Sequence, residues 1–269
     1  MAQASARVGV VGKSIFYAGS DLGNNNAGFH NSLYRGKYLG NGVTAAQYAQ
    51  ISAGTFDDLF IGDYWTINSV NYRIAAFDYW YNTGDTNCTT HHVVIMPDSN
   101  MLAADGSTTH WMHSSNDTSG GYVGTDFYAA TNNNTGKATI ISALNSAFGS
   151  AHLLNHREYL TNAASSGRPT AGSWHDSVVE IPTERMVYGN AVFAPVSDGS
   201  TVPANYSIDN SQLPLFALNH THICNRAHWW LRDVVSSTYF AHVYTDGGAN
   251  CSAASAAWVG VRPAFGIRA

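Results

Sequence analysis

The chain has 269 residues, of which 45% are hydrophobic and only 12% are charged, and its formal net charge at pH 7 is -5. It contains no run of Lys and Arg and no apolar run of bilayer length, so we expect neither nucleic-acid binding nor membrane insertion. The start, MAQASARVGVVGKS, lacks the apolar core of a secretory signal. We therefore expect a protein made in a reducing cytoplasm.

Residues 1–40 are rich in Gly, Asn and Ser and show no amphipathic period. We interpret them as an extended arm that packs on a neighbouring subunit. A flexible tail is the alternative that the same composition allows.

The first regular elements are predicted after residue 42. Residues 43–54 are typical of a short helix that Thr44 caps and Gly54 ends. Two alternating segments on either side of Asn68 and Ser69 indicate a β-hairpin. Residues 91–98 form a third strand candidate that closes at Pro97.

The middle of the chain alternates between polar loop and amphipathic segments. Residues 102–134 are predicted to be loop, and residues 137–149 a helix. The segment HLLNHREYLTNA, residues 152–163, is interpreted as another helix, SVVEIP as a short strand and TERMVYG as a helical turn. The final third consists of short apolar blocks between small polar residues, which favours many short strands.

The ionisable residues give little sign of catalysis. His152 and His156 have the i, i+4 spacing of a helical metal pair, but the HExxH order is absent. We interpret them as ordinary helix residues, and predict no metal, no cofactor and no catalytic residue. The three cysteines, Cys88, Cys224 and Cys251, are an odd number without a CxxC pair, so we expect free thiols.

The C-terminal segment carries a resemblance. Residues 225–269, with WWLR, a Gly-rich turn and a closing GVRPAF, resemble the end of a C-type-lectin-like module. This signature resembles a domain family of unknown function common in Firmicutes and their phages, related in shape to formylglycine-generating enzymes and to phage tropism determinants. FDDLFIGDYWTINSVNYRIAAFDYW, SAHLLNHREYLTNA and SQLPLFALN also look similar to that prophage family.

The resemblance implies an α+β fold, with an N-terminal arm over residues 1–40, a C-type-lectin-like domain over 41–269 and a strand-rich display region over 225–269. Trp229, Trp230, Arg232 and Arg262 are then scaffold. The two arginines stand within apolar blocks, so they need carboxylate or carbonyl partners, for which Asp233 or Asp63 could serve.

The display region combines aromatic and small polar residues in the way that antibody paratopes do. In phage proteins of this fold the corresponding stretch can be diversified by an adenine-directed retroelement; an ordinary polar loop is the alternative. The predicted ligand-contacting residues are Tyr239, His242, Tyr244, Asn250, Ser252, Ser255 and Trp258.

The expected function is that of a bacteriophage virion protein that recognises a host cell-surface ligand, either a protein or a glycan, and contacts other virion proteins. One alternative is a purely structural head-decoration or fibre protein. A second is a cell-wall-directed or formylglycine-type enzyme. Cys224 and Cys251 lack the cysteine pattern of formylglycine-generating enzymes, and the calcium-binding triplets of sugar-binding lectins are missing.

We predict a homo-oligomer, a trimer, held partly by the N-terminal arm. An arm with few core-forming residues can become ordered by burying Phe16, Tyr17, Phe29 and Tyr34 against a neighbour. Light scattering of a variant that lacks residues 1–40 should show a smaller assembly. An unchanged mass would refute the role of the arm.

Overall fold

The computed structural model describes residues 7–11, 14–18, 26–102, 111–129, 136–194 and 211–269. Helices and strands are mixed along the chain, which confirms the predicted α+β class. No helix among these described ranges is long and apolar enough to cross a membrane.

A six-stranded sheet joins the two halves of the chain. Its strands are β3 (Tyr38–Gly40), β4 (Tyr64–Ile67), β5 (Val70–Phe77), β6 (Val93–Pro97), β13 (Ala264–Ile267) and β9 (Val179–Glu180), in that spatial order. β3 and β4 are parallel, and the other neighbours are antiparallel. β13, the last described strand, lies between β6 and β9, so it joins the end of the described chain to the central sheet.

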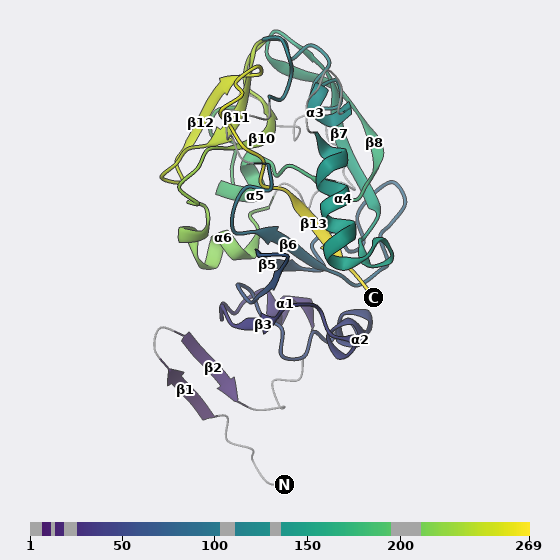
Figure 1. The fold of residues 1–269 in the computed structure, drawn as a ribbon, viewed down its shortest axis with the longest axis vertical. Coiled ribbons are helices and arrows are strands. Elements are labelled where there is room, and N and C mark those ends of the chain that lie inside the picture. The colour runs from purple at the N-terminus through teal and green to yellow at the C-terminus, as the bar shows by residue number, and fades with distance from the viewer. Residues whose placement is uncertain (1–6, 12–13, 19–25, 103–110, 130–135, 195–210) are drawn as a thin grey trace.

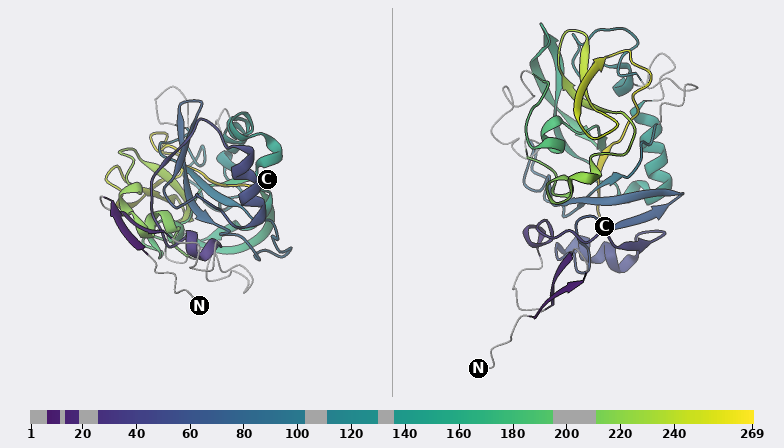
Figure 2. Two further views of the ribbon diagram at one scale, coloured as in Figure 1. Left: turned by 90° about the horizontal axis from the view of Figure 1, so that it is seen from below. Right: turned by 90° about the vertical axis from the view of Figure 1, so that its left-hand side faces the viewer.

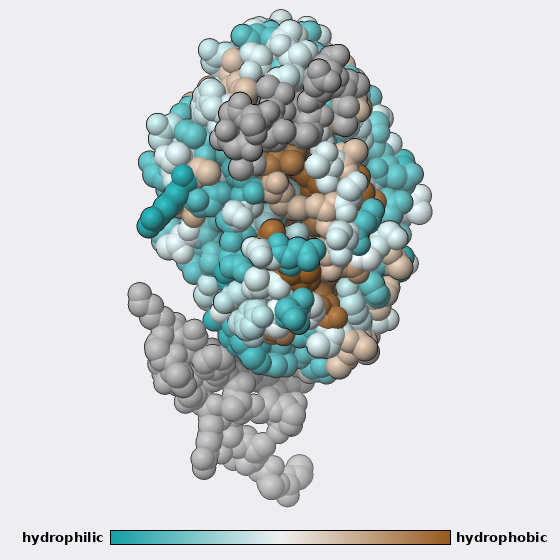
Figure 3. Space-filling model, viewed as in Figure 1, coloured by the Kyte–Doolittle hydropathy of each residue, from teal (hydrophilic) through white to brown (hydrophobic). Residues whose placement is uncertain are grey.

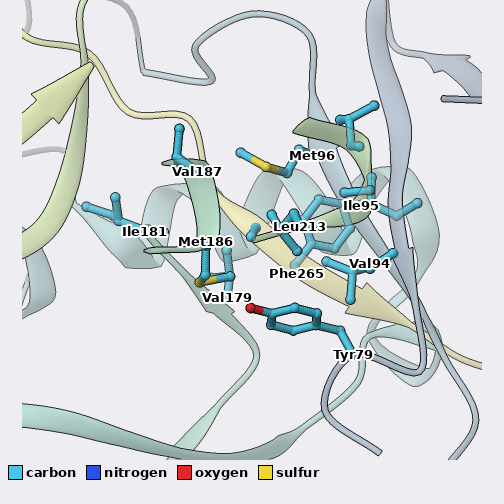
Figure 4. Packing of buried hydrophobic residues seen from close by; sticks show 14 of the residues in the cluster. Tyr79, Val94, Ile95, Met96, Val179, Ile181, Met186, Val187, Leu213 and Phe265 are labelled. Carbon is cyan, nitrogen blue, oxygen red and sulfur yellow. The ribbon is translucent and has the colours of Figure 1, made fainter. Parts of the chain in front are cut away.

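The predicted hairpin and third strand of this sheet are confirmed. β4 and β5 meet at Asn68 and Ser69, whose φ angles of 50° and 65° suit a tight turn that matches the twist of the strands. All five residues of β6 are buried. Figure 4 shows side chains of β6, β9 and β13 packed together with Tyr79, Ile181, Met186, Val187 and Leu213.

Two predicted helices lie beside the sheet. α2 (Ala45–Ala53) starts with a capping box between Thr44 and Gln47 and ends at Gly54, which has a φ of 67°. α4 (Lys137–Phe148) buries Ile140, Leu144 and Phe148. The Phe148 ring contacts those of Tyr72 and Phe265, so α4 covers the strands β5 and β13.

The helix predicted over residues 152–163 is wrong. A 3-10 turn, η1 (Ser150–His152), is followed by β7 (His156–Ser165), which forms a long hairpin with β8 (Arg168–Ser177). His156, Glu158 and Leu160 are buried with a period of two, which places them on one face of a strand. Residues at positions i and i+4 can share one face of a strand or of a helix, so this spacing alone fits both elements. The pairing with β8 selects the strand.

The C-terminal region forms a three-stranded antiparallel sheet of β10 (Trp229–Val234), β11 (Tyr239–Val243) and β12 (Ala249–Ala253). Figure 1 shows this sheet on one side of the molecule and α4 on the other, with β13 between them. Short helices precede it: α5 (Glu184–Tyr188), α6 (Pro214–Leu218) and η4 (His220–His222). α3 (Asp126–Ala129) lies in the predicted loop.

Part of the segment expected to be an arm packs on its own chain. α1 (Ala27–His30) buries His30, whose Nδ1 lies 2.6 Å from the carbonyl oxygen of Leu59. The rings of Phe29 and Phe60 are in contact, and the Tyr34 hydroxyl lies 2.7 Å from His222 Nε2. Phe29 and Tyr34 therefore contact their own chain, which corrects the expectation that a neighbour buries them.

The start of the described chain is a separate hairpin. β1 (Arg7–Val11) and β2 (Ser14–Ala18) pair antiparallel with each other and form a two-stranded sheet of their own. The hairpin lies at the end of the molecule away from β10–β12 (Figures 1 and 2). The side chains of Phe16 and Tyr17 are outside the described residues.

The buried arginines have carboxylate and carbonyl partners, which are of the predicted kind. Arg232 Nη2 lies 3.3 Å from Glu158 Oε2, and His156 Nε2 lies 3.0 Å from the other oxygen of the same carboxylate. Arg262 donates to the carbonyl oxygens of Pro97 and His222. Of the acids expected for these roles, Asp63 pairs with Arg35, and Asp233 accepts a hydrogen bond from the backbone nitrogen of Glu184.

Replacement of Glu158 by Ala should lower the free energy of unfolding by about 3–5 kcal/mol, because it leaves the Arg232 cation in the interior without that carboxylate. Chemical denaturation at pH 7 measures the loss. Asp85→Ala is the control, since Asp85 pairs with Arg157 at the surface. It should cause a far smaller loss. Equal losses in the two variants would contradict the structural role of Glu158.

Candidate functional site

An exposed aromatic cluster lies at the end of the three-stranded sheet. Its members are His228, Tyr244 and Trp258, which come from the residue before β10, the residue after β11 and the loop after β12. The ring centroids of Tyr244 and Trp258 each lie 4.6 Å from that of His228, and both rings meet it edge to face. Trp258 is 51% exposed and Tyr244 is 42% exposed. We call these three residues the aromatic cluster.

A buried polar pair supports the aromatic cluster from below. His242 on β11 is 1% exposed, and its ring centroid lies 5.6 Å from that of Trp258. His242 Nε2 lies 3.0 Å from the Ser252 hydroxyl oxygen on β12, and Nδ1 lies 3.1 Å from the carbonyl oxygen of Val243. Trp230 packs edge to face on His242. The exposed rings thus stand on a fully packed base.

The seven predicted contact residues do not form one surface. His242 and Ser252 are buried, so the structure corrects their assignment as direct contacts and makes them the support. Tyr239 is 42% exposed but stands at the other end of β11 from Tyr244. A rise of about 3.3 Å per residue places their Cα atoms about 16 Å apart along the strand. Trp258 and Tyr244 are the exposed members that the fold brings together.

The remaining two predicted residues are half-buried. Ser255 donates from its hydroxyl to Asn116 Oδ1 over 2.6 Å, so it anchors the loop after β12 to a distant segment. Asn250 Oδ1 accepts a hydrogen bond from the backbone nitrogen of Cys251. Both side chains therefore have local structural partners.

Strand β11 is regular although it buries residues on both of its faces. Phe240 and Val243 cannot share one face of a regular strand. β11 pairs with β12 in unbroken register, and the irregularity lies in β10 between Trp230 and Val234. Both Phe240 and Val243 are fully buried. A sheet that is covered on both faces needs no bend to bury them.

Sequence analysis missed His228. Its imidazole Nδ1 is buried and has no hydrogen-bond partner among the described residues. Its carbonyl oxygen accepts hydrogen bonds from Asn100 Nδ2 and from the Gly260 nitrogen, which fix the start of β10. Burial lowers the pKa of His228. The only sequence signal was its position directly before WWLR.

A surface hollow of about 570 Å³ lies at the loops that carry His228 and Tyr244 of the aromatic cluster. It is carried by the same two loops, residues 220–228 and 244–248. Its lining residues are His220, Thr221, Cys224, Asn225, Arg226 and Asp246. We call it the loop hollow.

A second hollow of about 390 Å³ lies between the loop after β5 and the β7–β8 hairpin. Cys88, His156, Arg157 and Asp176 are among its lining residues. Arg157 is held there by Asp85 and Asp176. Burial raises the pKa of the Cys88 thiol, which disfavours the reactive thiolate.

Neither hollow has the features expected of the enzyme alternatives. A glycosidase needs two facing carboxylates, and each hollow has one, Asp176 or Asp246. Each also has a single cysteine, and all three cysteines of the chain are free thiols. Across the described ranges no three His, Cys, Asp or Glu side chains gather as a metal site would require.

The residues assigned to the scaffold lie in the interior. Trp229, Trp230, Arg232 and Arg262 are each at most 1% exposed. The Arg262 guanidinium lies over the rings of Trp229 and Phe216, and burial lowers its pKa to about 10.

On the face seen in Figure 1, apolar residues show near the middle and polar residues surround them (Figure 3).

Residues 194–269 match a protein family described as "Domain of unknown function (DUF6273)". This match includes β10–β13, the aromatic cluster and the loop hollow. Searches of curated proteins and of solved structures found no match.

Acid should destabilise the site. Burial lowers the pKa of His242, and the nearby His228 lowers it further. The unfolded chain therefore takes up the proton first, below a pH of about 6.5, and stability is lost as the pH falls from there. The loss approaches about 1.4 kcal/mol per pH unit for each histidine that stays neutral in the fold.

Denaturant unfolding between pH 7 and pH 4.5 measures this slope. His242→Gln should make it shallower. Val243→Ala is the matched control, because it truncates a buried neighbour without a titratable group and should keep the full slope. The same slope in both variants would rule out His242 as the source.

Proposed function

We propose that this chain is a bacteriophage virion protein whose residues 41–269 form a C-type-lectin-like domain that displays a ligand-binding surface to the host cell. The observation that carries the proposal is the aromatic cluster. Two large rings are about half exposed, while the side chains beneath them are buried. About half of each ring stays in water as a held surface that a partner can cover, so we assign the two rings to binding.

The support beneath the cluster favours binding without rearrangement. His242 and Ser252 bond to each other below Trp258, and Trp230 fills the space beneath His242. Rings that are already held by edge-to-face contacts lose little conformational entropy when a ligand covers them. Tyr and Trp in this setting are the residue types that supply most of the energy of an interface.

The N-terminal hairpin suggests how the domain is attached. β1 and β2 form a sheet with no strand of the domain. They lie at the opposite end from β10–β12 (Figure 1). We propose that this hairpin joins copies of the chain into a homotrimer or holds them to other virion proteins, with the aromatic cluster directed outward. A purely structural fibre or decoration protein would share the hairpin but would have no use for the exposed rings.

Binding to bacterial cells tests the proposal. Tyr244→Ala and Trp258→Ala should each weaken adsorption of the labelled protein about 30-fold, the equivalent of about 2 kcal/mol, because each removes half of the exposed aromatic surface. Tyr239→Ala is the matched control, since Tyr239 is as exposed as Tyr244 but lies at the far end of β11. It should leave adsorption unchanged.

The melting temperature is recorded for every variant. Weakened adsorption with unchanged melting supports the proposal. Unchanged adsorption of both cluster variants would instead point to the structural alternative.

A further inference from the structure

The loop hollow is built by two loops that hold each other closely. Cys224 Sγ lies 3.2 Å from the carbonyl oxygen of Thr245. A Cβ atom on Gly247, which has a φ of 92°, would stand 3.2 Å from the Cys224 Cβ. The Tyr188 hydroxyl donates to the Gly247 carbonyl oxygen from α5. The walls of the hollow are therefore fixed by the fold.

Arg226 projects from this rigid frame in a strained conformation. Its φ is 63°, the left-handed region that non-glycine residues seldom occupy. The side chain of the neighbouring Asn225 donates a hydrogen bond to Asn100 Oδ1 and accepts one from the Ala227 nitrogen. These two bonds hold the loop in place. Arg226 is exposed and forms no ion pair with the described residues. The fold thus maintains a strained residue whose guanidinium is available to a ligand.

Asp246 supplies the opposite charge on the facing loop. One of its carboxylate oxygens accepts from the Gly248 nitrogen, which shapes the turn, and the residue is exposed. Arg226 and Asp246 line the same hollow without an ion pair between them. The hollow therefore presents hydrogen-bond donors from Arg226 and acceptors from Asp246, with formal charges that cancel.

This combination suits a neutral ligand with many hydroxyl groups. An anion would meet Asp246, and a cation would meet Arg226, so the balanced pair favours neither. A hydroxyl group can accept from the guanidinium and donate to the carboxylate. Tyr244 stands two residues before Asp246, and it contacts His228, two residues after Arg226. An exposed ring surface thus adjoins the polar hollow.

We infer that the loop hollow and the aromatic cluster together bind a neutral saccharide of the host surface. Its hydroxyl groups bind to Arg226 and Asp246, and the apolar face of its ring lies on Tyr244 or Trp258. The inference rests on the proposed function and names the ligand class of the same surface.

The test measures binding of the full chain to immobilised polyvalent conjugates by surface plasmon resonance, with a chelator present. The neutral probes are glucose, galactose, mannose, rhamnose and N-acetylglucosamine. The charged probes are glucuronic acid, N-acetylneuraminic acid and glucosamine. At least one neutral probe should bind, and the charged probes should bind more weakly.

Matched variants locate the site. Arg226→Gln and Asp246→Asn should each weaken binding of the neutral probe about tenfold or more, because each removes a hydrogen bond to a charged group. Arg226→Gly removes the guanidinium and suits the positive φ, so it should lose binding while its melting temperature stays unchanged. Arg168→Gln, on the exposed face of β8, is the control and should bind normally.

Adsorption to bacterial cells, with and without protease treatment of the cells, separates the two proposals. If adsorption survives protease and is competed by the neutral probe, the inference is supported. If protease abolishes adsorption and no neutral probe binds, the ligand is a protein, and the inference fails while the proposed function stands. Binding of charged probes alone also overturns the inference. If no cell adsorbs the protein, the proposed function fails as well.

Discussion

The pairing of buried charges is the constraint on which the rest of the structure depends. Glu158 on β7 is fully buried and meets Arg232 on β10 as well as His156. An ionised carboxylate or guanidinium in a protein interior is costly unless partners replace its water. The two strands belong to different sheets, so satisfying these charges fixes the β7–β8 hairpin against the three-stranded sheet.

Similar pairs hold the other layers. Glu180 on β9 accepts hydrogen bonds from Tyr122, Ser177 and Lys137, and Lys137 is the first residue of α4. Arg262 reaches from the segment before β13 to the Pro97 carbonyl at the end of β6. The contacts of Glu180 with Tyr122 and Lys137, and that of Arg262 with Pro97, join elements that are far apart in sequence. Their geometry is specific, whereas apolar packing alone would tolerate small shifts between layers.

The same contacts position the proposed binding surface. Arg262 also donates to the carbonyl oxygen of His222, and therefore fixes η4, whose first two residues line the loop hollow. Trp229 and Trp230 begin β10 directly after His228. Because both tryptophans are buried, they anchor His228, and with it the aromatic cluster, to the core. A rigid interior is what allows exposed rings and a strained Arg226 to keep one geometry. This physical link connects the core to the proposed function.

The sequence by itself determined the local elements whose signals are short-range. The capping box at Thr44, the turn at Asn68 and Ser69, and the apolar face of residues 137–148 depend on neighbours within a few residues, so each element formed as predicted. It also indicated that WWLR and GVRPAF are interior segments, because large apolar side chains with few charged neighbours favour burial. The α+β class follows from these elements.

Only the tertiary structure decided what depends on distant partners. The segment 156–165 became a strand because β8 pairs with it, although its spacing also suited a helix. Arg232 pairs with Glu158, a carboxylate 74 residues away that shares its buried space. His228 joined the site, and His242 and Ser252 moved beneath it, because exposure depends on what covers a side chain. The sequence around a residue does not show which distant segments will cover its side chain.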